Sequence, residues 1–120
     1  MIHWAEIPVT DFDRAKKFYD ALLNKEHATA VMGEHTYGFF QDADESFHGA
    51  FVAGEGYTPS ATGSLIYITC EPDLTEAQDR VESSGGKLLR AKYLIPGGNN
   101  GYMALFSDTE GNTVALHSSK

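Results

Sequence analysis

Glu6 and His117 are the two side chains of this sequence best suited to proton transfer. A carboxylate placed beside Trp4 and Tyr67 would lose hydration, and its pKa would rise toward that of a useful general base. His117 would be the matching acid–base partner. A simpler reading has Glu6 as a hydrogen-bonded or partly solvated pocket group and His117 facing solvent near the end of the chain. Two ligands are fewer than a functional metal site normally takes from a protein, so the pair predicts no metal.

The other reactive residues give weaker signals. The single cysteine, Cys70, cannot form an intrachain disulfide, so a reducing cytoplasm is the expected compartment. Strand alternation predicts that Cys70 lies beneath a helix, where a thiol is buried and inert. The run at residues 96–101 is rich in glycine and asparagine but precedes no helix, so it predicts a mobile lid rather than a phosphate site.

Composition excludes several classes of function. The 120 residues suit one domain, and 42% of them are hydrophobic, which is enough to build a core. Nine Lys and Arg against seventeen Asp and Glu give a net charge of −8, which disfavours nucleic acid and anionic membrane surfaces as partners. The N-terminal residues resemble no secretory signal, and no apolar run approaches the roughly 20 residues of a membrane span.

Two segments have the periodicity of amphipathic helices. The first covers residues 12–23, with Asp11 as a suitable N-cap. The second extends from residue 73 to about 84, where Asp73 and Glu76 resemble a capping box and two glycines follow. The remaining apolar runs predict strands at about residues 3–8, 28–32, 35–40, 48–53, 65–70, 87–93, 102–107 and 112–117.

A faint internal repeat organises these elements. Residues 11–15 resemble residues 73–77, and residues 40–42 resemble residues 106–108, which indicates a duplication unless the matches are chance. Each half is then β-α-β-β-β. The sequence therefore predicts an α+β fold in a single domain, with one module at about residues 1–55 and the other at about 63–120.

Alternation along the strands separates two faces. Ile7, Ile66, Val114 and their neighbours two residues away suit packing beneath the helices. The opposite face is mixed aromatic and polar, as a small-molecule pocket requires. It could also be partly exposed to solvent, or buried in a dimer interface. The expected ligand-binding residues are Trp4, Glu6, Leu65, Tyr67, Thr69, Tyr102, Ala115 and His117, with Tyr37 and Tyr57 as neighbouring aromatics.

Two segments resemble the vicinal oxygen chelate superfamily, which includes glyoxalase I, bleomycin-resistance proteins and extradiol dioxygenases. Residues 6–19 are similar to its opening strand-to-helix signature, which ends in Ala-x-x-Phe-Tyr. Residues 108–112 are similar to its late hairpin, with Thr109 where proline is usual. The resemblance implies paired modules whose curved mixed sheets form a cup with the helices outside.

In metal-using members, four His, Glu or Gln ligands come from the first and last strands of each module. The resemblance places them here at Trp4, Ala115, Leu65 or Ile66, and Ala50 or Phe51. None of these side chains binds a divalent cation. The expectation is therefore no metal and no cofactor, with a divalent metal only if the ligand positions are aligned differently.

The leading hypothesis is a cytoplasmic protein of bleomycin-resistance type that binds a small molecule in its cup, where acidic groups would favour cationic ligands. The alternatives are a metal-dependent lyase of glyoxalase type and a metal-free isomerase using Glu6. A homodimer is also expected, because open sheet edges invite pairing and twofold dimers are the commonest closed oligomers.

Overall fold

The computed structural model describes the whole chain, Met1–Lys120. Its elements are β1 (Ala5–Pro8), α1 (Phe12–Leu23), β2 (Thr29–Met32), β3 (His35–Gln41), β4 (Phe47–Ala53), β5 (Ile66–Thr69), α2 (Thr75–Arg80), β6 (Lys87–Leu94), β7 (Tyr102–Ser107) and β8 (Thr113–Ser118). None of the helices combines the length and apolar character needed to cross a membrane.

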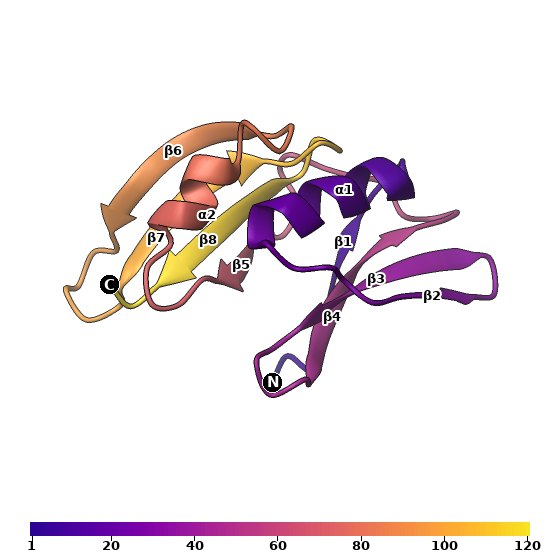
Figure 1. Ribbon diagram of the computed structural model, residues 1–120, viewed down its shortest axis with the longest axis horizontal. Helices are drawn as coiled ribbons and strands as arrows, with labels where there is room; N and C mark the ends of the chain where they lie inside the picture. Colours follow the sequence, from indigo (N-terminus) through magenta and orange to yellow (C-terminus); the bar gives the residue numbers. More distant parts are fainter.

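The strands form two four-stranded mixed sheets with the same topology (Figure 1). Sheet A has the order β1-β4-β3-β2, and sheet B has the order β5-β8-β7-β6. In each sheet the first strand is an edge and pairs in parallel with the last, while the other pairs are antiparallel. The predicted α+β fold of two β-α-β-β-β modules is confirmed, and the open, curved sheets are consistent with a cup.

One hydrophobic core joins the two modules. Phe18 and Tyr19 of α1 are fully buried, and the ring of Phe18 contacts Phe106 of sheet B while that of Tyr19 stacks on Phe51 of sheet A. Of the helix-facing residues predicted from strand alternation, Ile7, Val9, Val114 and Leu116 lie in this core, and Ile66, Ile68 and Cys70 pack against it. Burial of these apolar side chains against α1 and α2 is the main force that holds the modules together.

The two helices differ in how well the sequence predicted them. α1 has the expected bounds, and the Asp11 carboxylate accepts a hydrogen bond from the backbone N–H of Arg14 at 3.1 Å. The predicted span of α2 was too long, since the helix covers only Thr75–Arg80 and no capping box forms. Asp73 instead accepts hydrogen bonds from the N–H and hydroxyl of Thr75, and turns replace the helix after Arg80. Serine side chains that compete for backbone groups favour this early end.

The turn at residues 108–112 fastens sheet B to the start of α1. The Glu110 carboxylate accepts hydrogen bonds from the N–H groups of Thr10 and Asp11, at 3.0 and 2.8 Å, and pairs with the Arg14 guanidinium at 2.7 Å. Asn112 donates to the carbonyl of Pro8 at 2.7 Å. The resemblance at residues 108–112 therefore marks a structural contact between the modules.

Acid is expected to lower the stability of this protein over two separate pH ranges. Burial lowers the pKa of His27 below its ordinary value of 6.5. The unfolded chain therefore binds this proton more readily, and stability falls as the pH drops below about 6.5. Although burial of Glu110 would raise its pKa, the Arg14 guanidinium and the backbone N–H groups outweigh it and lower that pKa to about 2. The stability from ionised Glu110 is complete above its ordinary pKa of 4.5 and is lost as the pH falls from there toward 2.

Thermal melts across this pH range test the assignment. The Glu110→Gln variant should be less stable than the native protein at neutral pH and should lose less further stability below pH 4.5. Equal pH dependence of the two proteins in that range would show that Glu110 is not the group responsible.

Candidate functional site

Sheet A carries a cluster of aromatic rings on the side away from the helices. The register pairs Glu6 with Ala50, and Tyr37 and Phe39 with Val52 and Ala50, so these residues share that side of the sheet. We call the surface formed by Trp4, Glu6, Tyr37, Phe39, Phe47 and Tyr57 the aromatic face.

The rings of the aromatic face contact one another around Phe39. The centroid of Phe39 lies 6.2 Å from that of Trp4, 5.9 Å from that of Tyr37 and 5.0 Å from that of Phe47. None of these rings belongs to the core that joins the modules, and Phe47 is 45% exposed. An accessible aromatic cluster outside the core is a surface to which a planar or cationic molecule can bind.

Glu6 is held at the edge of this cluster by two donors. The Trp4 indole Nε1–H donates to one carboxylate oxygen at 3.1 Å, and the Tyr57 hydroxyl donates to the other at 2.6 Å. The hydrogen bond to Glu6, helped by burial, raises the pKa of Tyr57 to about 12, so the phenol keeps its proton. The carboxylate is thus fixed in position and retains unused lone pairs for a ligand.

Sheet B has its own surface on the side away from the helices. The Tyr67 and Tyr93 hydroxyls both approach the sulfur of Met103, at 3.7 and 2.9 Å. The Arg90 guanidinium carbon lies 3.4 Å from the centroid of the Tyr93 ring. Beside them Leu65 and Tyr67 are exposed, whereas Ala115, which pairs with Tyr67, is fully buried.

The structure does not bring Glu6 and His117 into contact. Each has partners within its own module, because His117 pairs with Thr69 across sheet B and its Nε2 lies 2.7 Å from the carbonyl oxygen of Asn100. The acid–base pair considered from the sequence is therefore not formed within one chain.

Tyr102 also lies apart from the other predicted ligand-binding residues. It pairs with Ser118, one position beyond the pair formed by Met103 and His117, so the pleat directs it toward the helices. There it packs against the core, with the ammonium of Lys92 4.7 Å from its ring centroid. The expectation that Tyr102 lines the same face as Tyr67 was wrong, because in β7 it is the neighbouring residue, Met103, that faces Tyr67.

Several residues of these two surfaces were not predicted from the sequence. Phe39 and Phe47 were not named, and Arg90, Tyr93 and Met103 were not assigned to a face. Tyr37 and Phe39 alternate along β3, a signal that would have found them. The bulges in β6 between Leu88 and Tyr93 shift its register, so alternation alone would not have placed Arg90 and Tyr93 correctly.

The family model of the Glyoxalase/Bleomycin resistance protein/Dioxygenase superfamily matches residues 1–116. The chain belongs to this superfamily. None of the curated proteins compared with it matches the sequence.

Solved structures of the superfamily share the fold at low sequence identity. A glyoxalase/bleomycin resistance protein from Albidiferax ferrireducens is 18% identical with a TM-score of 0.68, covering 95% of this chain and 94% of its own. A superfamily enzyme from Burkholderia phytofirmans is 18% identical with a TM-score of 0.67, covering 99% and 98%. A glyoxalase I mutant from Zea mays is 22% identical with a TM-score of 0.69 and covers 97% of this chain, which spans only 46% of the maize chain. These likenesses establish the fold.

The resemblance described from the sequence places the superfamily's metal ligands at Trp4, at Ala50 or Phe51, at Leu65 or Ile66, and at Ala115. None of these side chains carries an atom that coordinates a divalent cation. Elsewhere, the ligand atoms of Asp42, Asp44 and His48 lie within 4.8 Å of one another at the turn between β3 and β4, and all three residues are exposed. Exposed acidic groups of this kind are common without a metal.

Proposed function

We propose that this protein binds a small aromatic cation on the aromatic face, with its positive group beside Glu6. The observation that carries the proposal is the carboxylate held by both Trp4 and Tyr57 at the edge of a ring cluster outside the core. A fixed negative charge beside exposed π faces attracts a cation by charge and by cation–π contact.

We further propose that binding requires no metal. Membership of the superfamily does not decide its members' chemistry, because one fold supports many functions. The side chains at the implied ligand positions have no atom that coordinates a metal. This favours binding through aromatic contacts and Glu6 alone. Prior treatment with EDTA should therefore leave binding unchanged.

The charge of Glu6 is the feature to test. Trp4 is the only tryptophan, so its indole N–H gives a single NMR signal from within the site. We expect benzyltrimethylammonium to shift this signal saturably, and the Glu6→Gln variant to bind the probe about five- to tenfold more weakly because the charge-assisted attraction is lost.

The matched control is Glu82→Gln, which removes one negative charge from an exposed position without a side-chain partner. This variant should bind the probe as the native protein does. Equal affinity of Glu6→Gln and the native protein would contradict the role given to Glu6.

We also propose that the chain forms a homodimer. β2 and β6 have no neighbouring strand on their outer side, and Leu89 and Leu94 of β6 are 48% and 50% exposed. A second copy would cover such edges and apolar side chains, and charge repulsion is largely screened at physiological salt. Light scattering at micromolar concentration should give about twice the chain mass of 13.1 kDa, and a stable value near 13.1 kDa would contradict the proposal.

A further inference from the structure

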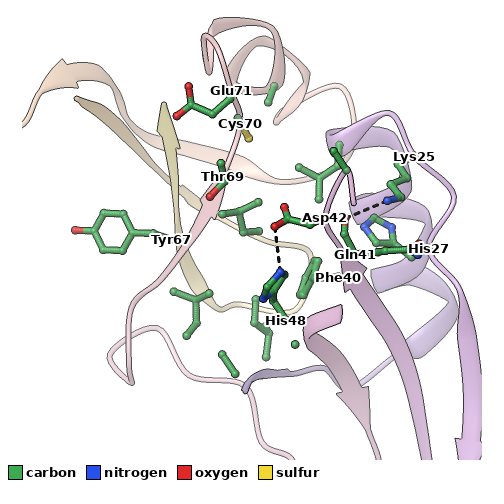
Figure 2. A pocket seen from close by; sticks show the side chains of 18 of the residues that line it. Lys25, His27, Phe40, Gln41, Asp42, His48, Tyr67, Thr69, Cys70 and Glu71 are labelled. Carbon is green, nitrogen blue, oxygen red and sulfur yellow. Dashed lines mark hydrogen bonds and ion pairs between the residues drawn. The ribbon is translucent and has the colours of Figure 1, made fainter. Parts of the chain in front are cut away.

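A cavity of about 710 Å³ lies between the two modules, and helix-facing side chains form much of its lining (Figure 2). One wall comes from β1, β3 and β4, and the other comes from β5 and α2. We call it the inter-module pocket. Ligand pockets commonly have volumes of about 300–1,000 Å³, so this one can hold a small molecule.

The inter-module pocket is separate from the aromatic face. No residue of the aromatic face lines it, and its floor consists of helix-facing side chains, among them Ile7, Phe40, Ile66 and Ile68. It opens between two strands that have no neighbour on that side, β1 and β5. A molecule in the pocket would therefore contact both modules at once.

The cations and carboxylates of the lining differ in how far they are already engaged. The Lys25 ammonium donates to the carbonyl of Gln41 at 3.0 Å, and Arg80 donates through Nε to the carbonyl of Leu22 at 2.9 Å. Both cations thus donate hydrogen bonds to backbone carbonyls of the first module.

Among the carboxylates, Asp73 pairs with Lys92 at 2.9 Å and Glu71 accepts hydrogen bonds from Ser119. Asp42 has only the side chain of His48, 3.0 Å away, and Glu76 has no hydrogen-bond or ion-pair partner. Figure 2 shows the Asp42 carboxylate pointing into the pocket. The lining thus combines an apolar floor with two carboxylates that can accept a further donor.

We propose that the inter-module pocket binds a second ligand, an amphipathic organic amine whose ammonium is attracted by the carboxylates of Asp42 and Glu76 while its apolar body covers the floor. A neutral molecule would leave these carboxylates unpaired, and a carboxylic acid would be repelled by them. The site and its ligand do not depend on binding at the aromatic face.

Cys70 makes this proposal testable, because it is the only cysteine and it lines the pocket. Burial raises the pKa of its thiol to about 11, so its reaction with dithiodipyridine at mildly alkaline pH is slow. A molecule that shields the thiol in the pocket will slow the reaction further. We expect hexylammonium to slow this reaction at least about fivefold at saturation. Hexanol and hexanoate should be much less effective, and the Trp4 indole signal should not move.

Variants identify the carboxylates. Asp42→Asn should raise the half-protecting concentration of hexylammonium about fivefold. Glu76→Gln tests the site without disturbing the hairpin, since the Glu76 carboxylate has no hydrogen bond or ion pair to lose, and it should also weaken protection. Asp79→Asn removes an exposed charge from α2 outside the lining and should leave protection unchanged.

Three results would overturn the proposal. Hexylammonium could fail to protect Cys70, or hexanol and hexanoate could protect it equally, which would leave no role for the carboxylates. The third result is slow reaction of Cys70 without any amine that becomes faster on dilution of the protein. It would show instead that a second copy of the chain covers the pocket.

Discussion

Replacing Asp108 with alanine is expected to lower the free energy of unfolding by about 3–4 kcal/mol, because several buried donors would lose their acceptor at once. The Asp108 carboxylate is almost fully buried and accepts hydrogen bonds from the Tyr19 hydroxyl at 2.7 Å and from the backbone N–H groups of Glu110 and Asn112 at 2.9 Å. Burial raises the pKa of Tyr19 well above its ordinary value, so its phenol remains a donor. Denaturant titration measures the loss.

Two further variants separate the buried network from a general charge effect. Tyr19→Phe removes one donor and should cost about 1–2 kcal/mol, and it should cost less in the Asp108→Ala background, where the acceptor is already gone. Asp13→Ala removes an exposed carboxylate and should change stability by less than about 0.5 kcal/mol. A loss below about 1 kcal/mol for Asp108→Ala would show that the 108–112 turn does not fasten the modules together.

Replacing Trp4 with alanine should weaken binding of benzyltrimethylammonium by tenfold or more while leaving the fold largely intact. The indole is part of the aromatic face and also donates to Glu6, so its loss removes contact area and frees the carboxylate. Since Trp4 lies outside the core, we expect a stability cost below about 1.5 kcal/mol. Calorimetric titration measures the affinity, and thermal unfolding measures the stability.

Phe18→Ala provides the contrast, because this fully buried core ring should cost about 3–5 kcal/mol when truncated. If Trp4→Ala destabilises the protein as much as Phe18→Ala does, then Trp4 is a structural residue and not a binding one.

The sequence predicted those parts of the fold that depend on local pattern. α1 has a regular apolar stripe and an N-cap, and both survive in the structure unchanged. The alternation of Ile7 with Glu6, and of Leu116 with His117, predicted correctly which side chains face the helices. α2 was predicted less well, because its short stripe is followed by serines and glycines that stop the helix early.

Contacts between distant residues could not be derived from the sequence. The hydrogen bond from Tyr57 to Glu6 joins residues 51 positions apart, and nothing in the local sequence indicates it. The inter-module pocket likewise depends on how β1 and β5 are spaced by the packing of α1 and α2. The composition of residues 108–112 is typical of a turn, but their role as a contact between modules follows from the three-dimensional structure.

The most direct test of a binding function for the aromatic face is a fragment titration followed by two-dimensional NMR of the amide and indole N–H signals. A mixed set of cationic, neutral and anionic aromatic fragments is added to the native protein. We predict that the cationic fragments shift the Trp4 indole signal and the amides of β3 around Phe39, and that anionic fragments of the same size do not. Shifts confined to other surfaces, or the same response to cations and anions, would contradict the proposal that this face recognises an aromatic cation through Glu6.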